Sequence, residues 1–191
     1  MSDALISQVK NCRLCQDLPL EPNPIVQFNP KAKILIAGQA PGRITYHKNR
    51  PFDDPSGDRL RDWLSVDRET FYDETQFAII PMAFCYPGTG SGGDLPPPAI
   101  CAKTWRQRLL DNLPELQLTL VIGRYAIDWH LHIDKKQTVT DIVKAWQSYY
   151  PRIIPLPHPS PRNNRWLKSN PWFEQELLPE LQSLVAINLN H

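Results

Sequence analysis

Four cysteines are the residues in this sequence best suited to joint chemistry. Cys12 and Cys15 form a Cys-x2-Cys pair, whereas Cys85 and Cys101 are separated by 15 residues. Four thiolates suit zinc or an iron–sulfur cluster, since both take four sulfur ligands. Zinc sites usually show two tight pairs, so the wide second pair favours a cluster and leaves zinc as the alternative. Four unrelated buried thiols are a third interpretation, which the shared pattern makes the weakest.

Two short motifs combine residues that can approach a ligand closely. Gly38-Gln39-Ala40-Pro41-Gly42 predicts a sharp turn whose backbone N–H groups can face a ligand. No Gly-Lys-Ser/Thr follows, so the turn is not a phosphate-binding P-loop. His158 lies between two prolines, on a rigid loop, where its ring can hydrogen-bond a carbonyl and stabilise negative charge on a leaving group.

Apolar stretches of strand length alternate with amphipathic helical patterns along the chain. This alternation predicts one domain over residues 1–191, with three α/β/α layers and a central, mostly parallel, four-stranded sheet. The glycine-rich residues 88–94 predict a flexible loop. The predicted strands are 33–37, 77–84, 118–122 and 152–156, and the predicted helices are 57–65, 97–113, 123–131, 138–147 and 171–185.

The motifs follow the predicted strands. Ligands of parallel sheets bind beyond the carboxyl ends of the strands. Residues 38–42 follow the first strand, and residues 85–88, 123–124 and 157–161 follow the other three. We therefore expect these four loops to meet at one rim of the sheet and to form the functional site there.

The composition sets few limits on the partner. A net charge of +1 neither requires nor excludes nucleic acid, so any DNA contact must come from a local patch. No apolar run is long enough to span a bilayer, and residues 1–15 lack the pattern of a secretory signal. We therefore expect a cytoplasmic protein with no membrane partner, where four cysteines are more typical of a metal or cluster than of disulfides.

Taken together, these features resemble the iron–sulfur branch of the uracil-DNA glycosylase superfamily, often called family 4, with this chain as a divergent member. The cysteine spacing is similar, and residues 38–42 resemble the family's first motif, GEAPG. Pro51-Phe52 matches its Pro-Phe, residues 85–88 its Cys-Arg-Pro-Pro-Gly loop, and residues 157–161 its second motif, HPSP. The resemblance spans roughly residues 10–185.

The resemblance implies the uracil-DNA glycosylase fold and a monomeric DNA repair enzyme. Such an enzyme flips uracil or another damaged base out of DNA and hydrolyses its N-glycosidic bond. Phe52 would stack on the flipped base, His158 would stabilise the base as it leaves, and Gln39 would position water.

The remaining roles implied by the resemblance fall into three sets. The substrate-binding residues would also include Gly38, Ala40, Pro41, Gly42 and Ser160. The DNA-binding residues would be Arg162, Asn163, Arg165 and Lys168. A structural 4Fe-4S cluster would be held by Cys12, Cys15, Cys85 and Cys101.

Three positions depart from the family pattern. Gln39 replaces a glutamate and cannot act as a base, and Ala40 replaces the aspartate or asparagine of other branches. Pro81 stands where the family usually has the asparagine that reads uracil. Asp53 and its neighbour Asp54, directly after Phe52, are our candidates for a replacement catalytic carboxylate, with Asp53 preferred. The alternatives are a weak or inactive relative that binds nucleic acid or a nucleobase without cleavage, and a zinc-stabilised protein acting on another nucleotide-like ligand.

Overall fold

Four strands form a single parallel sheet in the computed structural model, which describes residues 2–134 and 136–189. The order is β2 (Phe77–Ile79), β1 (Ile34–Ala37), β5 (Leu118–Ile122) and β6 (Ile153–Leu156). Every neighbouring pair is parallel, so each connection between neighbours must cross over the sheet. The predicted four-stranded sheet is confirmed.

Both faces of the sheet are buried, which explains why its strands are apolar throughout. Side chains alternate between faces along a strand. Ile34 and Ile36 of β1 therefore belong to one core, while Leu35 between them belongs to another. All three are fully buried. The three-layer α/β/α prediction is thus confirmed.

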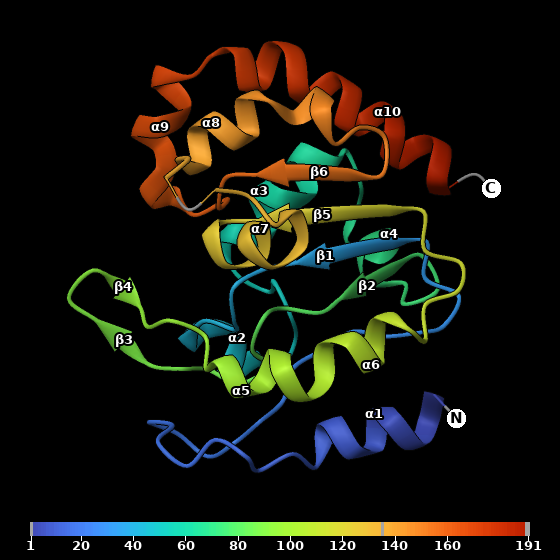
Figure 1. Ribbon diagram of the computed structural model, residues 1–191, viewed down its shortest axis with the longest axis vertical. Coiled ribbons are helices and arrows are strands. Elements are labelled where there is room, and N and C mark those ends of the chain that lie inside the picture. The colour runs from blue at the N-terminus through green and yellow to red at the C-terminus, as the bar shows by residue number, and fades with distance from the viewer. Residues whose placement is uncertain (1, 135, 190–191) are drawn as a thin grey trace.

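Helices supply the two outer layers (Figure 1). Helices α3, α4 and α10 pack on the face that carries Ile34, and α1, α6 and α7 pack on the other face, with α8 beside β6. The helices are α1 (Ser2–Lys10), α2 (Arg43–Lys48), α3 (Pro55–Leu64), α4 (Arg68–Tyr72), α5 (Ala99–Cys101), α6 (Gln107–Leu110), α7 (Arg124–Leu131), α8 (Val139–Lys144), α9 (Asn164–Ser169) and α10 (Leu178–Leu189). Among the described residues, none of the helices is long and apolar enough to cross a membrane.

The segment that follows β2 differs from its prediction. A strand over 77–84 was expected, but β2 ends at Ile79 and residues 80–84 continue as a buried irregular segment. Pro81 explains the early end, because proline has no N–H to donate to a sheet ladder. Residues 88–94, expected to be a flexible loop, contain a short hairpin of β3 (Thr89–Gly90) and β4 (Gly93–Asp94).

Arg106 satisfies the backbone groups that this irregular segment leaves without strand partners. The Arg106 side chain is fully buried and lies at the end of a π-helical segment, Ala102–Arg106. Its Nη1 donates to the carbonyl oxygens of Ile80 (2.9 Å) and Pro81 (3.0 Å). Its Nη2 lies 2.8 Å from His130 Nε2, which therefore accepts and leaves the imidazole neutral.

Acidic pH is expected to weaken the fold through His130. Burial, followed by the charge of Arg106, lowers the pKa of His130 to about 3. The unfolded chain, with a histidine pKa near ~6.5, binds a proton below that pH that the folded protein excludes. The stability contributed by the neutral His130 should therefore be fully present above about pH 6.5. Below that pH, the free energy of unfolding should fall by at most ~1.4 kcal/mol per pH unit.

Urea denaturation between pH 7 and pH 4 measures this slope. The His130→Gln variant should lose the His130 part of the slope, while His47→Asn, a change at an exposed histidine that does not act on His130, should keep that part. Equal slopes for wild type and His130→Gln would contradict the assignment.

Candidate functional site

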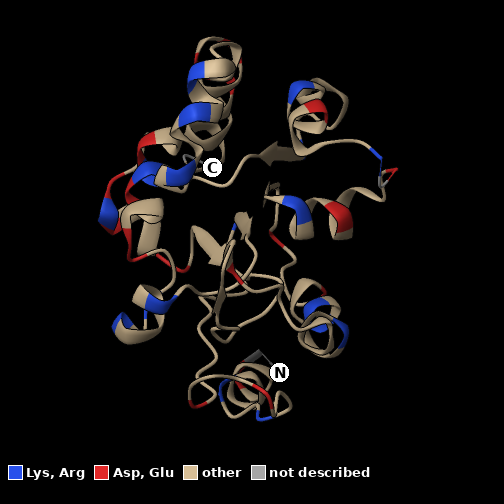
Figure 2. Cartoon of the chain, turned by 90° about the vertical axis from the view of Figure 1, so that its left-hand side faces the viewer, with Lys and Arg blue, Asp and Glu red and all other residues tan. Residues whose placement is uncertain are grey.

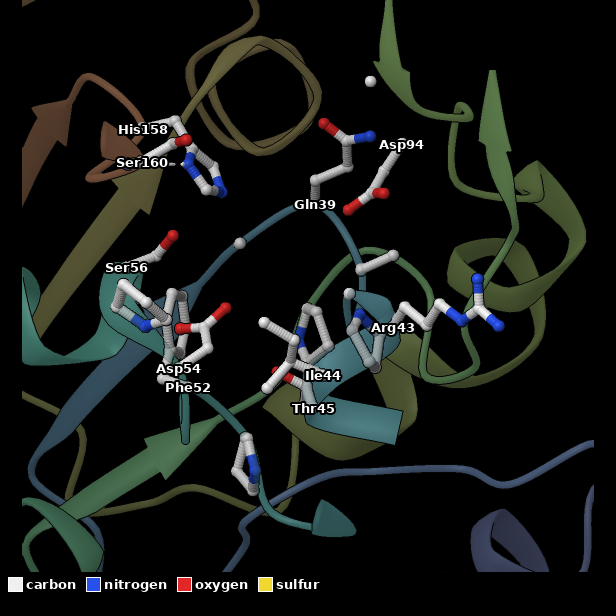
Figure 3. A pocket seen from close by; sticks show the side chains of 18 of the residues that line it. Gln39, Arg43, Ile44, Thr45, Phe52, Asp54, Ser56, Asp94, His158 and Ser160 are labelled. Atoms are coloured by element: carbon white, nitrogen blue, oxygen red, sulfur yellow. Dashed lines mark hydrogen bonds between the residues drawn. The ribbon is translucent and has the colours of Figure 1, made fainter. Parts of the chain in front are cut away.

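A cavity of about 540 Å³ lies at the carboxyl ends of the strands. Three loops line it: residues 38–45 after β1, residues 92–94 in the segment after β2, and residues 158–163 after β6. The turn at 51–56, which leads into α3, completes the wall (Figure 3). Residues 85–88 and 123–124, expected at the same rim, are not among the lining residues; Cys85 lines a second cavity, and Gly123 is the N-cap of α7.

Phe52 lies in this wall in an unusual backbone conformation. Its φ of 53° is left-handed, a region that non-glycine residues rarely adopt. Arg61 Nη1 donates to the Phe52 carbonyl oxygen at 3.3 Å, and the Phe52 ring packs edge-on against Phe71. The ring also lies beside Gly38, where a Cβ would be 3.4 Å from Phe52 Cζ. Phe52 is thus an aromatic face fixed next to the turn of the first motif.

Gly57 makes the Phe52 conformation possible. A Cβ at Gly57 would overlap the carbonyl oxygen of Phe52. We expect Gly57→Ala to lower the free energy of unfolding by about 2–3 kcal/mol, because the backbone at Phe52 must shift. Urea denaturation measures the loss. Gly92→Ala is the matched control, since nothing lies within 4 Å of a Cβ there; equal stability of the two variants would contradict the prediction.

His158 presents a hydrogen-bond donor to the cavity. The backbone N–H of Ser160 donates to His158 Nδ1 at 3.2 Å, so the neutral ring carries its proton on Nε2. Burial lowers the pKa of His158, opposed by the charges of Asp54 and Asp94. Asn163 Nδ2 donates to the His158 carbonyl oxygen at 2.7 Å and fixes the loop. The ring is therefore held as a neutral Nε2–H donor.

The first motif is tied to the segment after β2. Met82 N donates to the Gly38 oxygen at 2.8 Å, and Ala83 N donates to the Gln39 oxygen at 3.0 Å. The Gln39 side chain also reaches this segment, since its Nε2 donates to the Leu95 oxygen at 3.0 Å. Gly38, Gln39, Ala40, Pro41 and Gly42 all line the cavity, as the motif position led us to expect.

The carboxylates are arranged differently from the prediction. Asp53 does not line the cavity: its carboxylate pairs with Arg68 (2.8 Å) and Lys48 (3.3 Å). The hydrogen bond from Arg68 is the main cause of a lowered pKa at Asp53. Asp54 and Asp94 line the cavity instead. The structure therefore gives Asp53 a place in surface ion pairs, brings its predicted neighbour Asp54 to the site, and adds Asp94, which the sequence analysis missed.

The two cavity carboxylates are each held at one oxygen. Asp54 Oδ1 accepts from Gly57 N at 2.8 Å and caps the start of α3. Asp94 Oδ1 accepts from Thr89 Oγ1 at 3.0 Å, across the β3–β4 hairpin. Asp54 is the one of the two predicted carboxylates that reaches the cavity, and the Asp-Pro pair that opens the helix explains its place. The glycine-rich sequence around Asp94 carried no comparable signal.

The predicted DNA-binding residues separate into two groups. Arg162 and Asn163 line the cavity, and the Arg162 guanidinium packs so closely on Gly93 that a Cβ there would overlap it. Arg165 and Lys168 are exposed on α9 and do not line the cavity. Basic segments lie on several helices around the strand ends, interspersed with acidic ones (Figure 2). Any DNA contact is thus local, in keeping with the small net charge.

The four cysteines converge on one small apolar cavity. Cys12, Cys15, Cys85 and Cys101 all line it, together with leucine, proline, alanine and phenylalanine side chains. Trp105 Nε1 donates to Cys12 Sγ at 3.3 Å. Burial raises the pKa of Cys85 to about 11 and that of Cys101 to about 12. Within residues 2–134 and 136–189, no three His, Cys, Asp or Glu side chains are grouped closely enough for a single metal ion.

Comparison with known proteins identifies a family to which this sequence is similar. Residues 25–182 match the sequence model of the uracil DNA glycosylase superfamily. The chain is also similar to the solution NMR structure of a candidate uracil DNA glycosylase from Methanosarcina acetivorans, with 16% sequence identity and a TM-score of 0.49. That similarity covers 83% of this chain and 94% of the other. The family match includes both cavity motifs, Cys85 and Cys101, and begins after Cys12 and Cys15.

Proposed function

The chain belongs to the uracil-DNA glycosylase superfamily, and from this membership we propose that it excises a damaged base from DNA by hydrolysing the N-glycosidic bond. The observation that carries the proposal is that Phe52 and His158 line the same cavity at the carboxyl ends of the strands. An aromatic face binds an unstacked base, and a neutral Nε2–H stabilises charge as the base departs.

The proposed reaction begins with a base turned out of the helix. Phe52 stacks on that base, and its fixed backbone means that little order must be gained on binding. His158 Nε2–H donates to a carbonyl oxygen of the base as the C1′–N bond breaks and its electron pair leaves with the base. Water then attacks C1′ beside the turn at residues 38–42, completing hydrolysis to a free base and an abasic sugar.

DNA is the proposed partner, bound mainly through the rim of the cavity. Arg162, Arg165 and Lys168 would contact phosphates, with Arg162 nearest the extruded base because it lines the cavity. Such contacts position the duplex without reading its sequence. We further propose that the protein acts as a monomer, as the resemblance implies.

We also propose a 4Fe-4S cluster as the resident cofactor. The donor set fits: four thiols line one apolar cavity, and an indole N–H already points to one of the sulfurs. When bound, the cluster would supply a structural cross-link. Cys12 and Cys15 would then fasten the N-terminal segment to the segment between Cys85 and Cys101.

The excised base is expected to include more than uracil. Pro81 lines the cavity where the family usually has a uracil-reading asparagine, and its carbonyl oxygen is engaged by Arg106. Neither the proline ring of Pro81 nor its carbonyl oxygen can offer both a hydrogen-bond donor and an acceptor, as an asparagine amide does. A pocket without that amide discriminates less between bases of similar shape.

A panel of oligonucleotides tests the proposal. Duplex and single strands carrying uracil, hypoxanthine or other damaged bases are incubated with excess protein, and alkali reveals abasic sites as strand breaks. We expect the most product from uracil opposite guanine, because a mispaired base is easiest to flip. The absence of product from every substrate, with DNA binding intact, would refute the proposal.

A catalytically weak relative is the second candidate, and one observation favours it. Gln39 occupies the position of the family glutamate, and its amide is engaged with the Leu95 oxygen. The first motif therefore presents no base of its own. This candidate predicts tight binding of free uracil or DNA in the same assays, with no strand breaks.

A further inference from the structure

We infer that Asp94 is the catalytic carboxylate of this chain, supplied by the β3–β4 hairpin in place of the one missing from the first motif. The inference rests on the proposed glycosylase function and adds a residue to its chemistry. Asp94 lines the same cavity as Phe52 and His158 although it is far from both in sequence. Figure 3 shows it on the Gln39 side of the cavity, across from His158.

The hairpin is fastened at two points, which place Asp94 at the first motif. Gln39 Nε2 donates to the carbonyl oxygen of Leu95, the residue directly after Asp94, at 3.0 Å. On the other side, the Arg162 guanidinium packs against Gly93, the residue directly before it. The side chain that replaces the family glutamate therefore holds the segment that carries the aspartate.

A hydrogen bond to Oδ1 orients the Asp94 carboxylate, which leaves Oδ2 for the proposed reaction. Thr89 Oγ1 donates to Oδ1 at 3.0 Å, and the Thr89 hydroxyl in turn lies 2.6 Å from the Tyr86 hydroxyl. Oδ2 lies over the first motif, 3.4 Å from where a Cβ on Gly42 would be. Because residue 42 is a glycine, the space beside Oδ2 that a side chain at this position would fill is left open.

Asp54, the other cavity carboxylate, suits a different task. Its Oδ1 caps α3 through Gly57 N, and it follows Phe52 by two residues, on the side of the cavity that holds the base. Asp94 lies opposite, beside the backbone turn where water would approach C1′. The two carboxylates therefore flank the base and the sugar, respectively.

In the reaction, the C1′–N bond breaks and its electrons leave with the base, giving a cationic sugar. The negative charge of Asp94 stabilises that cation, and Oδ2 accepts a proton from water as the water oxygen bonds to C1′. The same proton passes through solvent to the anionic base. One water molecule is consumed, and the carboxylate is regenerated.

The test compares Asp94→Asn with Asp54→Asn, each of which keeps the acceptor oxygen of its local hydrogen bond. In single-turnover excision of uracil from DNA, Asp94→Asn should be slower by about 100-fold. Asp54→Asn should lose less, and the exposed Asp62→Asn should match wild type. Melting curves confirm that all variants are folded. An Asp94→Asn protein with wild-type rate, or a larger loss in Asp54→Asn, would overturn the inference.

A binding measurement decides the matter even if no base is excised. Duplexes carry either a cationic pyrrolidine or a neutral tetrahydrofuran at the abasic position, with free uracil added. A carboxylate at the sugar should favour the cationic duplex by about tenfold in wild type, and Asp94→Asn should abolish that preference. No preference in wild type, or a preference retained in Asp94→Asn, refutes the role of Asp94. Absence of excision alone refutes only the proposed function.

Discussion

Replacement of His158 by alanine is expected to slow base excision by about 100- to 1,000-fold, the effect of removing one donor that faces developing negative charge. The hydrogen bond from Ser160 N to Nδ1 leaves Nε2–H as the group that faces the cavity. Burial lowers the pKa of His158, so the ring is neutral at neutral pH and its Nε2–H is available for the proposed hydrogen bond to the base. The measurement is single-turnover excision of uracil from a duplex.

Two further variants separate the donor from general damage. His158→Gln retains an N–H donor and should recover part of the rate lost in His158→Ala. His132→Asn changes an exposed histidine that does not line the cavity and should match wild type. Binding of DNA that contains an abasic analogue should change little in His158→Ala, because no charge develops in that complex. A rate for His158→Ala within a few fold of wild type would refute the donor role.

Replacement of Cys101 by serine is expected to prevent binding of the proposed 4Fe-4S cluster and to lower the melting temperature by about 10 °C. Cys101 is the buried member of the four and packs in the same core as Leu5 and Val9 of α1. Loss of one ligand should release the link between the N-terminal segment and the rest of the domain. The measurements are visible absorbance, iron and sulfide content, and thermal melting after anaerobic purification.

The control is Ala102→Ser, which adds a hydroxyl one residue further along the same helical segment. It should keep the colour and the melting temperature. A colourless wild-type protein with one zinc per chain would contradict the cluster and favour the alternative cofactor. A wild-type protein without any bound metal would support the third interpretation, in which the four cysteines are unrelated buried thiols.

The strands could be predicted because burial on both faces leaves a continuous apolar run, as in residues 118–122. The end of β2 at Ile79 was not predicted, although Pro81 indicates that the strand cannot continue through that position. The apolar run continues to Phe84 because those residues are buried as well. Their backbone hydrogen bonds, however, go to the Arg106 side chain at Ile80 and Pro81 and to the first motif at Met82 and Ala83. A hydrophobic pattern reports burial and does not report which group accepts or donates the hydrogen bonds.

The candidate site was predictable where it follows strands and not where it depends on turns. Residues 38–42 and His158 lie beyond β1 and β6, as the topology requires. Asp53 and Asp54 differ by one position, and only the cap at α3 decides which faces the cavity. Asp94 depends on a hairpin of glycines and on a long-range hydrogen bond from Gln39, which has no local signature.

The contact between Gly57 and Phe52 has a consequence for the evolution of this sequence. The carbonyl oxygen of Phe52 occupies the space that any side chain at 57 would need. A mutation at 57 therefore carries a stability cost unless the turn at 52 has already been rebuilt. Positions 52 and 57 should consequently change together: descendants that preserve the left-handed turn at Phe52 should preserve the glycine, and those that lose the glycine should also lose the present form of this cavity wall.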